Sequence, residues 1–231
     1  MEDNYDHLQI PESRIEEVVV SSDEFAGIIN SEKFSKALAL ASKTTKKTSR
    51  ETGFSVRIDN NNKVFIGEIT AGAFDEISNE VDTQIISKMD TNEIDMDWEQ
   101  NICSTPLLNF HFHPDSEGAV IPSNADISNF LREESQASIG VGHVLKDGSV
   151  DLLIVKPKNY PLYRDLLEEY ADQFAHRPTQ AEIIQGLEKA GLSSIVVHFT
   201  NKNGKLSLDP ESAKKINELG KLKFSKDSFL F

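Results

Sequence analysis

The sequence has little cysteine and no long apolar run. Cys103 is its only cysteine, so an internal disulfide and a paired-cysteine metal site are both excluded. No stretch of about 18 apolar residues occurs, and the first ten residues lack the basic and apolar segments of an export signal. We therefore expect a cytoplasmic chain that does not cross a membrane, with any metal held by His, Asp or Glu.

Basic residues are also scarce. The 231 residues include 24 Lys and Arg against 38 Asp and Glu, which gives a formal net charge of -14. This balance repels nucleic acid and anionic membranes, so we expect neither as a partner. With 38% hydrophobic residues, a chain of this length can bury one good core.

Residues 1–30 are predicted to form an acidic N-terminal arm. The first 24 residues carry eight acidic side chains and one Arg14, and the first dozen show no apolar periodicity. From Ser31 the pattern changes, and apolar residues recur at helical spacing behind this plausible helix cap. They are Phe34, Ala37, Leu38 and Ala41.

The region 31–157 alternates helical and strand patterns and is predicted to be one domain. In chain order we expect the helix from Ser31, a hairpin of strands 54–59 and 63–69, a strand over 107–113, a helix from Ser123 and a hairpin turning at Asp147-Gly148. The segment 68–99 holds ten acidic residues and one lysine, and is predicted to be an acidic insertion with a short helix.

Residues 158–231 are predicted to form a mainly helical C-terminal extension. Helical patterns cover 162–174, 180–192 and 210–219, and one strand pattern covers 195–200. The boundary near 157 rests on Pro157 and Pro161, which end the preceding hairpin.

The segment Asn109-Phe-His-Phe-His-Pro114 carries the clearest chemical signal. In a strand, alternate side chains share a face, so Phe110 and Phe112 point to the core while His111 and His113 point together to the other side. Two such imidazoles suit zinc, which binds His nitrogens at about 2.0–2.1 Å and takes a third protein ligand plus water in catalytic sites. Asp126 follows in the first turn of the helix opened by Ser123.

Each half of this pattern has a structural explanation of its own. Ser123-x-x-Asp126 is also a capping box, in which each residue binds the other's backbone N–H. A His-x-His pair on a strand is commonly just exposed or hydrogen-bonded. Their occurrence together, in this order and within sixteen residues, favours a metal site.

The combination His111-x-His113-Pro114 followed by Ser123-x-x-Asp126 resembles the JAMM signature of the JAB/MPN metalloproteases, the zinc isopeptidases and deubiquitinases. The resemblance covers about residues 31–157. The family's upstream glutamate corresponds to Glu51, just before Gly53, with Glu68 as the second candidate.

Two positions depart from the family pattern. Twelve residues separate His113 from Asp126, which is longer than the family's usual spacing, so Asp115 or Glu117 is an alternative third ligand. Phe112 replaces the usual serine or threonine between the histidines, a change in core packing because this side chain points away from the metal.

The resemblance implies an α/β fold with a curved, mixed, mostly antiparallel sheet flanked by helices. It implies that His111, His113 and Asp126 hold Zn²⁺ with water in the fourth position, that Glu51 is the general base and that Ser123 donates to the oxyanion. The implied reaction is hydrolysis of an amide at the C-terminus of ubiquitin or a ubiquitin-like modifier. The acidic segment 68–99 would suit a modifier with a basic face.

Two other functions remain as alternatives. One is a non-catalytic MPN-type scaffold within a larger complex, and the other is a different zinc hydrolase that uses the same two histidines. The presence of all the expected site residues favours the enzyme. The resemblance is compatible with a homo- or hetero-oligomer.

Overall fold

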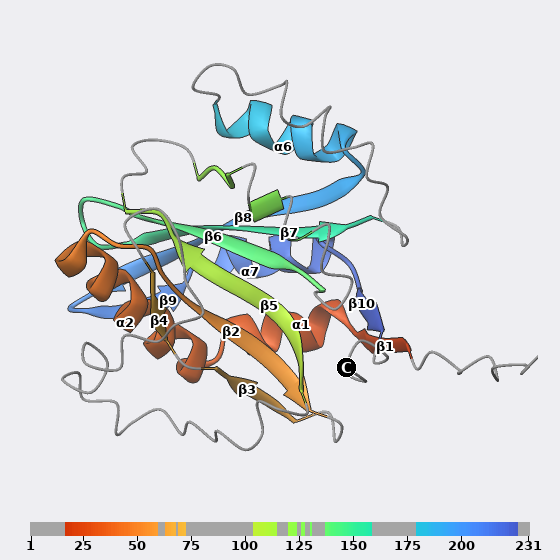
Figure 1. Ribbon diagram of the computed structural model, residues 1–231, viewed down its shortest axis with the longest axis horizontal. Helices are drawn as coiled ribbons and strands as arrows, with labels where there is room; N and C mark the ends of the chain where they lie inside the picture. Colours follow the sequence, from red (N-terminus) through yellow and green to blue (C-terminus); the bar gives the residue numbers. More distant parts are fainter. Residues whose placement is uncertain are drawn as a thin grey trace, which may run out of the picture.

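The computed structural model has an α/β fold built around a curled, mixed sheet that forms a half-barrel (Figure 1). The residues it describes are 17–59, 63–67, 69–72, 104–114, 120–123, 126–127, 130, 137–158 and 179–225. Among the helices in these ranges, none combines the length and apolar content that a membrane span requires.

Seven strands follow one another across the sheet, and an eighth pairs at the side. Their spatial order is β3 (Val64–Ile66), β2 (Thr52–Asp59), β5 (Ser104–Phe112), β6 (Ile139–Val144), β7 (Val150–Pro157), β8 (Leu192–Lys202) and β9 (Lys205–Leu208), with β4 (Thr70–Ala71) paired to the start of β2. The β5–β6 pair is parallel and the other pairs are antiparallel. The predicted mixed, mostly antiparallel sheet is therefore confirmed.

Helix α2 (Glu32–Thr48) confirms the helix predicted behind Ser31. The Ser31 side chain accepts the backbone N–H of Phe34 at 3.1 Å, and the predicted apolar stripe is fully buried. The helix ends where Ser49 adopts a left-handed φ of 52°, which turns the chain toward β2. Glu51 therefore lies directly before the first residue of β2.

The two faces of the sheet cover two separate cores. On the first face, strand residues pack under α2, α1 (Ser22–Ile29) and α7 (Pro210–Glu218) in a main core that contains Phe54, Phe110 and Phe112. On the second face, Val141 and Leu153 pack against residues 120, 127 and 130 and against α6 (Gln180–Lys189). Along β7 the alternation is plain, since Leu152 and Ile154 belong to the main core while Leu153 and Val155 belong to the second.

Segments near the two ends of the described chain pair with each other. Strand β1 (Glu17–Val20) and strand β10 (Leu222–Ser225) form an antiparallel two-stranded ribbon. Residues 17–30, within the expected acidic arm, thus form β1 and α1, and a capping box between Ser21 and Glu24 opens the helix.

The described part of residues 158–231 contributes both helices and strands. Helices α6 and α7 lie close to the predicted bounds, and β8 and β9 continue the sheet begun in the region 31–157. The predicted helix over 162–174 and almost all of the predicted acidic insertion lie outside the described residues.

Candidate metal centre

His111, in β5, and His113, directly after the strand ends, face the same way, as the alternation predicted. Phe112 is fully buried in the main core, and its ring meets Phe110 edge to face with centroids 4.8 Å apart. His111 and His113 point to the opposite face and are only partly buried, with 13% and 19% of their side chains exposed. Phe112 lies between them in the sequence, so its buried ring holds the backbone from which both histidines project.

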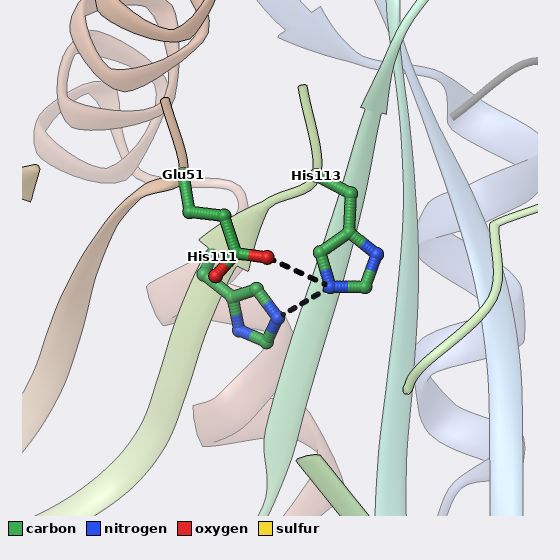
Figure 2. A group of neighbouring side chains, drawn as sticks. All are labelled: Glu51, His111 and His113. Carbon is green, nitrogen blue, oxygen red and sulfur yellow. Dashed lines mark hydrogen bonds and ion pairs between the residues drawn. The ribbon is translucent and has the colours of Figure 1, made fainter. Parts of the chain in front are cut away.

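The two imidazoles and Glu51 converge on one point (Figure 2). His111 Nε2 lies 3.0 Å from His113 Nε2, and Glu51 Oε1 lies 3.6 Å from His113 Nε2. Each of the three residues offers one ligand atom, and these atoms all lie within 4.8 Å of one another. The group could therefore hold a metal ion.

Asp126 joins this group from the far side of the loop after Pro114. Its Oδ1 lies 3.2 Å from His111 Nε2 and its Oδ2 lies 3.3 Å from His113 Nε2. In a tetrahedral zinc site with bonds of about 2.0–2.1 Å, neighbouring donor atoms lie about 3.3 Å apart. The two imidazole nitrogens and the two oxygens of this carboxylate thus lie at about the spacing of neighbouring zinc ligands.

The capping box between Ser123 and Asp126 leaves the Asp126 carboxylate able to act as a metal ligand. Ser123 Oγ accepts the backbone N–H of Asp126 at 3.1 Å, and Asp126 Oδ2 accepts the backbone N–H of Ser123 at 2.6 Å. A carboxylate has lone pairs enough for a backbone N–H and a further ligand. The cap therefore orients the Asp126 carboxylate toward the histidines.

The electrostatics of the group favour a bound cation. Burial, the largest single effect, opposes charge on the His113 ring, but the hydrogen bond to Asp126 and the charges of Asp126 and Glu51 outweigh it and raise the pKa of His113. Burial also opposes charge on Asp126, but the hydrogen bonds and charges of His111 and His113 hold the pKa of Asp126 far below its ordinary value. The Asp126 and Glu51 carboxylates therefore stabilise a positive charge beside the His113 ring.

A row of ionisable residues continues from the histidines across the sheet. The parallel β5–β6 pair ends with Phe112 opposite Gly142, and His113 and His143 each follow directly. His143 pairs with Asp151 and Asp151 with His198, whose Nδ1 lies 2.7 Å from Asp151 Oδ1. Sequence reasoning missed this row because it depends on the register of four strands.

One atom of this row has no hydrogen-bond partner in the part of the chain that the structure describes. Nδ1 of His143 is buried and makes no hydrogen bond within the described residues. A buried polar atom of this kind usually meets water or a ligand. The row of His143, Asp151 and His198 therefore continues the polar surface that begins at His111 and His113.

The structure does not test the alternatives that the sequence left open. Glu68, the second candidate for the base, and Asp115 and Glu117, the alternative ligands, lie outside the described residues. Comparisons of the chain with protein-family models, with curated proteins and with solved structures found no match.

Proposed function

We propose that this protein is a zinc-dependent metalloprotease of the JAB/MPN type, an isopeptidase that hydrolyses an amide at the C-terminus of ubiquitin or a ubiquitin-like modifier. The observation that carries the proposal is the convergence of His111, His113 and Asp126 at 3.0–3.3 Å, with the Glu51 carboxylate beside them.

The chemistry of the donor set favours zinc. Two imidazole nitrogens and one carboxylate oxygen form a ligand set that catalytic zinc sites use, with one position left for water. A bound zinc ion would supply a Lewis acid and lower the pKa of a water molecule toward neutrality. The three residues would hold it, and the Phe112 anchor and the Ser123 cap would orient them.

Glu51 has the position expected of a general base. It lies at the rim of the ligand group with 14% of its side chain exposed, within reach of a water or substrate atom held there. As the base, Glu51 takes a proton from the attacking water and returns it to the leaving amine, which in an isopeptide belongs to a lysine.

Ser123 can assist at the developing oxyanion. Its Oγ accepts the backbone N–H of Asp126, so its own O–H proton is available to donate, and the residue is exposed to solvent. A donor at this position stabilises the negative charge that develops on the carbonyl oxygen. No covalent intermediate with the chain is required.

The test compares Glu51→Gln, His113→Ala and a control variant, Glu188→Gln, on the exposed side of α6. The substrate is a ubiquitin-like modifier with a fluorogenic amide at its C-terminus. We expect Glu51→Gln to keep zinc and to lose at least about 100-fold in kcat, the contribution typical of a general base. His113→Ala should lose zinc and activity, and Glu188→Gln should match the parent.

The outcomes separate the alternatives. An active Glu51→Gln together with an inactive Glu68→Gln would assign the base to Glu68. Zinc binding without cleavage of any modifier amide would contradict the proposed isopeptidase activity and favour the non-catalytic MPN-type scaffold. Cleavage of unrelated small peptides or phosphoesters alone would favour another zinc hydrolase.

A further inference from the structure

One end of the sheet is strongly basic. Exposed lysines and one arginine come from three segments, which are the last turns of α2 with the residues that follow, the β6–β7 turn and the β8–β9 turn. We call this set the basic rim. Its members are Lys43, Lys46, Lys47, Arg50, Lys146, Lys202 and Lys205.

Direct contacts join the three segments of the basic rim. Lys46 Nζ donates to the backbone carbonyl of Leu145 at 3.1 Å, next to Lys146. Asn201 Nδ2, beside Lys202, donates to the backbone carbonyl of Asp147 at 3.4 Å. Figure 1 shows the end of α2, the β6–β7 turn and the β8–β9 turn together at the left of the view. The basic rim is thus one continuous surface.

The basic rim borders the candidate metal centre. Arg50 directly precedes Glu51, and Lys146 lies three residues after His143, in the row that continues from His113. A polypeptide whose amide reaches the ligand group from this end of the sheet would therefore pass close to these cations.

The fold itself explains only part of the basic rim. Lys46 and Lys47 stabilise the C-terminal end of the α2 dipole. Lys202 and Lys205, however, lie directly opposite each other across the β8–β9 pair, where like charges destabilise a hairpin. Bound anionic groups would relieve this repulsion.

The acidic residue within these two turns is already engaged. Asp147 accepts the backbone N–H of Ser149 at 2.9 Å and the Ser149 hydroxyl at 3.0 Å. Its carboxylate therefore stabilises the β6–β7 turn through both oxygens.

We propose that the basic rim binds acidic side chains of the substrate polypeptide next to the scissile amide. This inference rests on the proposed function, since it assigns the surface to the substrate of that site. Exposed charges act over about 10 Å at 0.1 M salt, so a short acidic segment experiences the basic rim more than the net charge of -14.

An acidic polypeptide fits this surface better than a nucleic acid does. The segments that carry the basic rim, residues 43–50, 145–149 and 202–205, contain no aromatic side chain on which a base could stack. An extended polyanion would also reach the acidic remainder of the molecule, whose net charge repels it.

The test uses fluorescence anisotropy on the full chain with three short labelled probes. These are a glutamate–glycine peptide, the same peptide with glutamine for glutamate, and an oligothymidylate of equal length. The variant is Lys47→Glu with Lys146→Glu. Its matched control is Lys189→Glu with Lys215→Glu, which makes the same change in net charge on exposed lysines of α6 and α7.

We expect the glutamate peptide to bind the parent and the glutamine peptide not to bind. The rim variant should weaken binding about fivefold or more, since each exposed ion pair contributes up to about fivefold in affinity. The control variant should change it less than about twofold. Equal weakening by both variants, absence of binding, or tighter binding of the oligothymidylate would each overturn the proposal.

The two proposals can fail separately. Binding is measured on the parent and on Glu51→Gln, so it does not depend on turnover. Rim-dependent binding without cleavage of any modifier amide would contradict the proposed function alone. Cleavage of a modifier amide could instead proceed at the same rate with and without acidic residues beside the amide, and at the same rate in the parent and the rim variant. That result would contradict only the proposed role of the basic rim.

Discussion

Replacing Gly142 with alanine is expected to destabilise the chain and to weaken metal binding. Gly142 pairs with Phe112 across the parallel β5–β6 pair, on the face opposite the histidines. A β-carbon there would lie 2.6 Å from Phe112 Cε1 and 2.7 Å from Phe110 Cζ. Carbon atoms in contact prefer about 3.5–4.0 Å, so a ring or a strand must move.

The size of the effect follows from the packing around this glycine. Phe112 is fully buried and its ring meets Phe110 at an interplanar angle of 87°, so neither ring has free space to enter. Overpacking of this kind costs about 1–3 kcal/mol. For a chain of 231 residues that corresponds to a fall in Tm of about 2–12 °C. Displacement of Phe112 also moves its neighbours His111 and His113, and zinc affinity should fall about tenfold.

Gly27 provides the matched control. It is exposed in α1, and a β-carbon there would meet no atom within 4 Å. Gly27→Ala should therefore stabilise the chain by about 0.5–1 kcal/mol through helix propensity. Thermal unfolding of the metal-free protein measures both variants. An unchanged or raised Tm for Gly142→Ala, alongside the expected gain for Gly27→Ala, would refute the packing argument.

Two further predictions concern the ligands themselves. Ser123→Ala removes the acceptor for the Asp126 backbone N–H and should lower zinc affinity about tenfold in a chelator competition; an unchanged affinity would show that the cap does not orient Asp126. Zinc must displace a proton from His113, whose pKa is raised, so the apparent zinc affinity in a chelator competition should be constant at high pH and should begin to fall at a pH above the range of an ordinary histidine. An apparent affinity that stays constant down to the carboxylate range would contradict histidine ligation.

Local patterns were enough to predict much of the site. Alternation along β5 put His111 and His113 on one face, and the Ser123-x-x-Asp126 spacing predicted the cap. The β6–β7 hairpin follows from Asp147-Gly148, where Gly148 has the positive φ of 85° that the turn needs. Such features depend on neighbours in the sequence, which is why the sequence alone reveals them.

Contacts between distant segments could not be predicted in the same way. The β1–β10 ribbon pairs Glu17 with Ser225, and nothing near either residue specifies the other. The acidic composition favoured an open arm there, although the Ser21 capping box and the buried Phe25 were signals of α1. The row from His113 to His198 likewise depends on strand register, which the sequence leaves unspecified.

The most direct test of the central claim is zinc per chain, measured by elemental analysis on the purified protein and on Asp126→Ala after reconstitution with zinc. The convergence of His111, His113 and Asp126 predicts about one zinc in the parent and little in the variant. No zinc in the parent, or equal zinc in both proteins, would contradict the proposed ligand set.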